Sequence, residues 1–129
     1  MRGFTASRLR SFGNAFHGWW YVLRTQRNAW LHAIIAAVVL ALGIWLGLRP
    51  VEWAVILLTM TVVFAAEFLN TAIEAVVDLA SPQQHPLAKV GKDVGAAAVL
   101  ITALGAVVVG ALILGPPLWT RLRPLFGVR

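Results

Sequence analysis

The chain alternates long uninterrupted apolar runs with short polar breaks. Residues 29–48 and 94–115 carry no formal charge, and each run is long enough to cross roughly 30 Å of hydrocarbon as a helix. A third run, 52–80, is apolar in its first half and carries acids in its second half. The breaks LRPVE (48–52) and SPQQHP (81–86) contain prolines, which begin or end helices. The pattern predicts three spanning helices, at about 28–48, 52–80 and 87–115.

The N-terminal segment has a different pattern, in which large apolar side chains recur at helical spacing with polar residues between them. The apolar positions are Leu9, Phe12, Phe16, Trp19 or Trp20, and Leu23. A helix with an aromatic stripe and a basic face lies in the plane of the membrane interface. We therefore predict a surface helix at about 4–25, the alternative being a loose basic tail. Residues 116–129 are predicted to form a basic C-terminal tail, and the whole chain, 1–129, a single domain.

Composition favours a membrane protein. The chain is 60% hydrophobic, against roughly 45–50% for an ordinary soluble domain. It has no cysteine, which excludes disulfides, thiolate metal sites and a cysteine nucleophile. A net charge of +6 is also found in nucleic-acid-binding proteins, but here the basic residues stand at the ends of apolar runs, as in membrane proteins. We expect no nucleic-acid partner.

The distribution of Lys and Arg predicts the orientation. With three spans, the N-terminal segment and the 81–92 loop lie on one side of the membrane, and the remaining basic residues lie on the other. The first side carries Arg2, Arg8, Arg10, Arg24, Arg27, Lys89 and Lys92, and the second carries Arg49, Arg121, Arg123 and Arg129. The side richer in Lys and Arg faces the cytoplasm. The end of the second span that carries the acids is therefore predicted to be cytoplasmic.

The stretch AEFLNTAIEAVVD (66–78) holds three of the five acids of the chain. At 100° per residue, Glu67, Asn70, Glu74 and Asp78 fall within an arc of about 80° on one helix face. Carboxylates four residues apart repel each other, and a charge near hydrocarbon costs at least a few kcal/mol. This acidic stripe therefore requires cations, a protein partner or water.

Lys92 and Asp93 open the third span. Because the 81–86 connection is short, the second and third spans run antiparallel, and this pair lies beside Glu74 and Asp78. Gly91, Gly95 and Ala98 form a small-residue face that allows a close approach of the two helices. One interpretation is that the acids only form salt bridges between helices, with Lys89, Lys92 or Arg27.

The carboxylates outnumber the lysines on that side, which favours a divalent cation. Mg²⁺ prefers one or two carboxylates together with phosphate oxygens and water, a combination that indicates a nucleotide. Lys92 would suit phosphate oxygens as a point charge. VGKD (90–93) lacks both the upstream glycine and the Ser or Thr of a P-loop. His32, on an apolar helix, is predicted to be a packed or hydrogen-bonded residue rather than a metal ligand.

Two other classes of function use similar features. A proton- or cation-handling membrane subunit carries acids on one helix face, and an interaction protein pairs them with a basic partner helix. A proton relay carries polar groups through the bilayer centre, whereas the acids here crowd toward one end of their span. The location of the acids therefore favours an enzymatic site at one membrane face.

AEFLNTAIEAVVDL (66–79) followed by HPLAKVGKDVGAAAVL (85–100) resembles the prokaryotic diacylglycerol kinase and undecaprenol kinase family. The resemblance runs from about residue 11 to residue 113. It implies an all-α integral membrane protein with an N-terminal surface helix and three transmembrane helices per subunit, assembled as a homotrimer in the bacterial inner (plasma) membrane. The active sites are implied to lie at the cytoplasmic side between subunits. The implied reaction moves the γ-phosphoryl group of ATP to the hydroxyl of a membrane lipid alcohol, diacylglycerol or undecaprenol; QHPLAKVGKD is slightly closer to the undecaprenol branch.

The resemblance also implies roles for single residues. Glu67 matches the general base, Asn70 a residue that organises the site, and Glu74 a ligand of the Mg²⁺ bound to ATP. Asp78 falls near the nucleotide, and Lys92 and Asp93 match a pair at the phosphate and nucleotide site. Better-known members of the family carry a second metal-binding glutamate where this chain has Gln26, whose neutral oxygen is a weaker ligand for a hard cation. Either Gln26 binds the metal through its oxygen, or Asp78 or water takes that place.

Overall fold

The computed structural model describes residues 2–83 and 85–126, with side chains from Arg10 onward. The described residues form four α-helices and one short 3-10 helix, and they contain no strand. The elements are α1 (Arg2–Thr25), α2 (Arg27–Leu46), α3 (Pro50–Ala80), α4 (Pro86–Leu122) and η1 (Arg123–Phe126). The predicted all-α class is confirmed. The end of the predicted basic tail, 127–129, lies outside the described residues.

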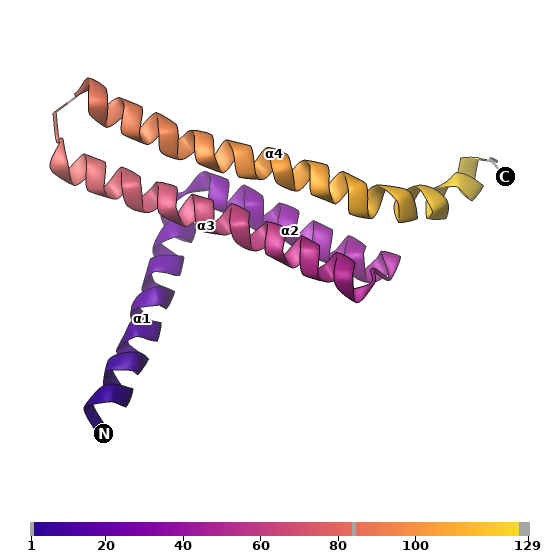
Figure 1. The fold of residues 1–129 in the computed structure, drawn as a ribbon, viewed down its shortest axis with the longest axis horizontal. Coiled ribbons are helices and arrows are strands. Elements are labelled where there is room, and N and C mark those ends of the chain that lie inside the picture. Colours follow the sequence, from indigo (N-terminus) through magenta and orange to yellow (C-terminus); the bar gives the residue numbers. More distant parts are fainter. Residues whose placement is uncertain (1, 84, 127–129) are drawn as a thin grey trace.

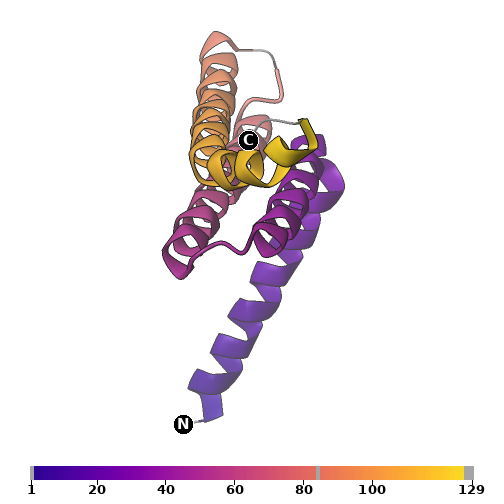
Figure 2. The same cartoon turned by 90° about the vertical axis from the view of Figure 1, so that its right-hand side faces the viewer.

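Helices α2, α3 and α4 run side by side, and α1 leaves this bundle at a steep angle (Figure 1). The end-on view shows the same arrangement, with α1 extending away from the three-helix bundle (Figure 2). The most extensive packing is between α3 and α4, which are antiparallel because only residues 81–85 connect them. When the three-helix bundle lies along the membrane normal, α1 lies along the membrane surface.

Three helices are long and apolar enough to span a membrane: α2, α3, and α4 with its η1 extension. Few side chains are buried within the chain, among them Ala29, Ile56 and Val99. Many large apolar side chains, such as Leu58 and Ile101, face outward instead. A soluble protein of this size rarely exposes so much apolar surface, whereas a bilayer covers it. The chain is a membrane protein with three spanning helices and an N-terminal helix, as predicted.

The connection between α2 and α3 is defined by local chemistry. Gly47 ends α2 in the left-handed region at φ 72°, and its N–H donates to the carbonyls of Gly43 and Ile44. Only glycine adopts this conformation without steric cost. Arg49 then caps α3, and its backbone N–H donates to Glu52 over 2.7 Å. The hydrogen bond from the Arg49 side chain to Glu52, aided by their charge attraction, raises the pKa of Arg49.

Helix α4 extends beyond the end predicted for the third span. The sequence predicts a span ending near residue 115, but the helix continues through Pro116 and Pro117 to Leu122. Each proline removes one helical hydrogen bond. The hydroxyl of Thr120 donates to the carbonyl of Pro116 over 2.9 Å, which adds a local contact there. Arg121 lies over the ring of Trp45, 5.1 Å from its centroid, and so ties this extension to α2.

Candidate active site

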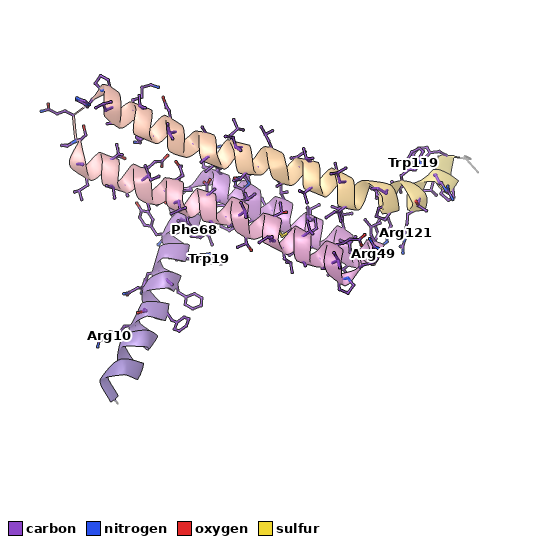
Figure 3. All side chains as sticks on the ribbon, in the orientation of Figure 1. Arg10, Trp19, Arg49, Phe68, Trp119 and Arg121 are labelled. Atoms are coloured by element: carbon purple, nitrogen blue, oxygen red, sulfur yellow. The ribbon has the colours of Figure 1, made fainter. Side chains whose placement is uncertain are left out.

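A pair of aromatic rings joins the N-terminal helix to α3. Trp19 of α1 stacks on Phe68 of α3, with ring centroids 6.3 Å apart and an interplanar angle of 11° (Figure 3). Phe68 directly follows Glu67 in the chain. The contact therefore fixes α1 at the level of the first acid of the stripe.

The acidic stripe runs from the protein interior to its surface. Glu67 is 1% exposed and Asn70 7% exposed, Glu74 is half-buried, and Asp78 is exposed. At 1.5 Å per residue, Glu67 lies roughly 26 Å along α3 from Pro50. If the start of α3 lies at one edge of the hydrocarbon, Glu67 lies near the other edge, since the hydrocarbon is about 30 Å thick. Glu74 and Asp78 then project beyond it, toward water.

Two amide side chains bind the Glu74 carboxylate. Asn70 Nδ2 donates to Glu74 Oε1 over 3.2 Å, and Gln26 Nε2 donates to Glu74 Oε2 over 3.2 Å. The α1–α2 junction therefore meets the stripe at Glu74. Both oxygens of Glu67 and Oδ1 of Asn70 are buried and have no hydrogen-bond partner among the described residues. Buried polar atoms usually have partners, and their absence here marks a place able to receive a ligand.

The lysines lie farther along the stripe. Lys92 Nζ of α4 lies 2.8 Å from Asp78 Oδ1 of α3, and Lys89 pairs with Asp93 within α4. The predicted salt-bridge alternative therefore holds for Asp78. Glu67 and Glu74 form no ion pair with any described residue. A cleft of about 800 Å³ opens beside these charges at the α3–α4 connection; it is lined by residues that include Asp78, His85, Lys89, Lys92 and Asp93.

Glu74 and its neighbours offer a divalent cation few protein ligands. Among the described residues, no three or more His, Asp or Glu side chains cluster in a way that could hold a metal ion. A metal cage built from protein carboxylates alone therefore does not form within the described chain. Glu74 offers one carboxylate, and Gln26 offers a neutral carbonyl oxygen. Mg²⁺ accepts this combination when phosphate oxygens and water complete its shell, so the residues fit a cation that arrives with a nucleotide.

An apolar cavity of about 450 Å³ lies between α2, α3 and α4, on the side of Glu67 that faces the start of α3. His32, Val63 and Phe64 are among its lining residues. Val63 is one helical turn before Glu67, so the cavity ends about one helical turn from the buried end of the stripe. His32 lines this cavity as a half-buried side chain, and no described group of metal-ligating residues includes it.

Sequence reasoning missed two contacts of the site. The regular aromatic stripe of the first helix indicated a membrane surface, but not that Trp19 stacks on Phe68. The small-residue face indicated that α3 and α4 approach closely, but not that Asn70 fills the space left by Gly95. Both contacts depend on the rotation of one helix about its axis relative to another, and a single sequence does not specify this rotation.

The fold and the site together define a class of protein. Three spanning helices carry a buried carboxylate, and beyond it, toward one end of the bundle, lie a carboxylate bound by amides, a lysine and an open cleft. The polar groups gather at one end of the bundle, as in a membrane enzyme whose chemistry takes place at the membrane surface.

Comparison with known proteins identifies the family. The family model for prokaryotic diacylglycerol kinase matches residues 13–114. The undecaprenol kinase of Bacillus subtilis (strain 168) is 43% identical over 109 residues, which cover 84% of this chain and 89% of that protein. The diacylglycerol kinase of Synechocystis sp. is 44% identical over 111 residues, 85% of this chain but 63% of that longer protein. The diacylglycerol kinase of Escherichia coli (strain K12) is 34% identical over 103 residues, which cover 73% of this chain and 83% of that protein.

This chain belongs to the prokaryotic diacylglycerol kinase family. The family predicted from the sequence is confirmed, and so is the class of activity, that of a lipid kinase. The alternative of a proton- or cation-handling subunit has no support among these relatives.

Proposed function

We propose that this lipid kinase transfers the γ-phosphoryl group of ATP to the hydroxyl of a membrane lipid alcohol, diacylglycerol or undecaprenol. The products are ADP and either phosphatidic acid or undecaprenyl phosphate. The observation that carries this proposal is the gradient of exposure along α3: Glu67 is buried in the bundle, Glu74 is half-buried and Asp78 is exposed, so the stripe crosses a boundary between protein interior and water. A lipid hydroxyl and a water-soluble nucleotide can meet only at such a boundary.

Glu67 is proposed as the general base. Its carboxylate is buried and unpartnered among the described residues, so it can accept a hydrogen bond from a lipid hydroxyl. As the hydroxyl oxygen forms a bond to the γ-phosphorus, its proton passes to Glu67, and the bond from the γ-phosphorus to the β–γ bridging oxygen breaks. The electron pair of that bond leaves with ADP. General-base help of this kind contributes about 10²–10⁴ to the rate.

Asn70 and Gln26 are proposed to orient Glu74, because each donates one hydrogen bond to it. Glu74 would hold a Mg²⁺ ion, with Gln26, Asp78 or water as the second ligand. Mg²⁺, when bound, neutralises charge on the β- and γ-phosphates, which is a main part of catalysis in phosphoryl transfer.

Asp78, Lys92 and Asp93 are proposed to bind the nucleotide, since they line the cleft at the α3–α4 connection. Lys92 is paired with Asp78 over 2.8 Å, and this pair holds its ammonium group at the cleft. Phosphate oxygens compete with Asp78 for that group. Lys92 can thus exchange Asp78 for a phosphate group, and its positive charge keeps an anionic partner.

The site is proposed to face the cytoplasm of the bacterial cell, at the inner membrane. Arg24, Arg27, Lys89 and Lys92 stand at the end of the bundle that carries the stripe, and Arg49, Arg121 and Arg123 stand at the other end. The cytoplasmic end is the one richer in basic residues, and the cytoplasm is also where ATP is available. The functional unit is proposed to be a homotrimer.

The direct test is an assay of purified protein in detergent with Mg²⁺ and ATP. Diacylglycerol, undecaprenol and a ceramide are supplied separately, and both ADP and phosphorylated lipid are measured. We expect equal amounts of ADP and lipid phosphate with at least one of the first two alcohols. ATP hydrolysis without a phosphorylated lipid, for all three, would contradict the proposal. The ratio of kcat/KM between diacylglycerol and undecaprenol assigns the substrate.

A further inference from the structure

Gly95 of α4 lies directly against the side chain of Asn70 of α3. It is buried, and a Cβ atom placed on it would collide with Asn70 Oδ1. The same Cβ would lie 3.4 Å from Asn70 Cγ and 3.9 Å from Asn70 Cα. The amide group of Asn70 thus occupies the space that any other residue at position 95 would take.

The orientation of the Asn70 amide follows from its other partner. A carboxylate only accepts hydrogen bonds, so the NH₂ group must face Glu74; Nδ2 indeed donates to Glu74 Oε1 over 3.2 Å. The carbonyl oxygen must then point the opposite way, toward Gly95. Asn70 therefore bridges the distance between the surface of α4 and the Glu74 carboxylate.

No other glycine on α4 touches the acidic stripe in this way. A Cβ on Gly91, one turn earlier on the same face, would meet only Val77 Cγ2 at 3.8 Å, an ordinary contact. Cβ atoms on Gly105 and Gly110 would meet nothing within 4 Å. Close packing of α3 and α4 does not by itself require glycine at every small position, and the requirement at position 95 comes from Asn70.

We propose that Gly95 is a positioning residue of the active site, whose missing side chain lets Asn70 reach Glu74 and lie beside Glu67. The inference rests on the proposed function. The clashing atom is the end of a side chain, so the fold accommodates a larger residue by moving the Asn70 amide. That movement breaks the hydrogen bond to Glu74 and removes the Asn70 amide donor from between the carboxylates of Glu67 and Glu74. The main damage falls on catalysis rather than on folding.

The test compares Gly95→Ala with Gly91→Ala as its matched control. Both changes add one methyl group on the same helix face and raise helix propensity equally. We expect Gly91→Ala to keep wild-type kcat, and Gly95→Ala to lower kcat by a factor on the order of 10², the penalty for displacing a group by about 1 Å. Equal kcat values for the two variants would overturn the proposal.

A double-mutant cycle separates action through Asn70 from a general packing defect. Asn70→Ala removes the clashing amide, so Gly95→Ala should lower activity only marginally when it is added to Asn70→Ala. If it lowers that variant's activity by the same factor as it lowers the wild type, Gly95 acts independently of Asn70 and the proposal is wrong. If Gly95→Ala alone does not fold, recovery of folded protein in the double variant supports the proposal, and no recovery overturns it.

A spectroscopic readout makes the test independent of activity. The ¹⁵N side-chain amide signal of Asn70, assigned by its loss in Asn70→Ala, should shift in Gly95→Ala and stay in place in Gly91→Ala. An unchanged signal in Gly95→Ala overturns the inference. If the wild type phosphorylates no lipid but the signal shifts as expected, the proposed function fails while the structural coupling of Gly95 to Asn70 stands.

Discussion

At the scale of single residues, the burial of Glu67 is the central feature. A carboxylate that is 1% exposed, with both oxygens unpartnered among the described residues, is costly to maintain. Glu52, at the other end of the same helix, is bound by Arg49 and shows how the chain satisfies an acid that has only a structural role. The contrast supports the role proposed for Glu67.

Replacing Glu67 with Gln should abolish lipid phosphorylation. The amide keeps the shape of the side chain but cannot accept the hydroxyl proton, so the rate should fall by about 10²–10⁴. Phosphorylated lipid would be measured with radiolabelled ATP on purified protein. Glu52→Gln is the matched control, because Gln also completes a capping box, and it should retain wild-type activity. If Glu67→Gln retains more than about half of the wild-type rate, Glu67 is not the base.

Replacing Gln26 with Glu should tighten the dependence on divalent metal. The Gln26 amide now donates to Glu74 Oε2 over 3.2 Å. A glutamate there loses this hydrogen bond, repels Glu74 and offers a second charged oxygen, so a bound cation becomes more favourable. The metal concentration for half-maximal activity, with Mg²⁺ or Mn²⁺, should decrease. An unchanged value would mean that residue 26 is not near the metal, and that Asp78 or water completes its shell.

At the scale of helices, the stacking of Trp19 on Phe68 couples the surface helix to the site. Trp19→Ala should raise the KM for the lipid alcohol by roughly 2–10-fold, because an aromatic pair contributes about 0.5–1.5 kcal/mol beyond its buried area. The KM for ATP should change little, since the nucleotide cleft lies at the α3–α4 connection. Phe16→Ala is the control, an exposed aromatic side chain one turn earlier on α1. Equal effects of the two changes would show that only membrane affinity of α1 is altered.

The spanning helices and their approximate positions were predictable from the sequence, because the length of an apolar run and the position of a proline act on the chain locally. The stripe Glu67, Asn70, Glu74 was predictable for the same reason: residues three and four apart share a helix face. Partners across helices were predictable only as far as chain connectivity limits them, as for Lys92 and Asp78. The continuation of α4 past Pro116 was not predicted, since it depends on contacts such as that of Arg121 with Trp45.

At the scale of the whole molecule, a single chain brings the acidic stripe together with Gln26 and Lys92. The same chain does not cover these residues: Asp78 is exposed, and α1 extends away from the bundle (Figure 2). Polar groups at the membrane edge need protein or water around them. This argues for an oligomer, and the family resemblance supplies the number three. A mass in mild detergent equal to three chains is expected, and a monomeric mass would contradict it.

Mixed assemblies test which residues of a site belong to one chain. Gln26→Lys places a cation against Glu74 and should inactivate the site, as Glu67→Gln should. Gln26 and Glu74 are in contact within one chain, and Glu67 lies on the same helix as Glu74. Each site in a mixed oligomer therefore takes residues 26 and 67 from the same chain, and every chain in the mixture carries one of the two changes. Co-assembly of the two inactive variants should restore no activity, measured after joint refolding and compared with a mixture containing wild-type chains. Restored activity would mean that Gln26 completes the site of a neighbouring chain.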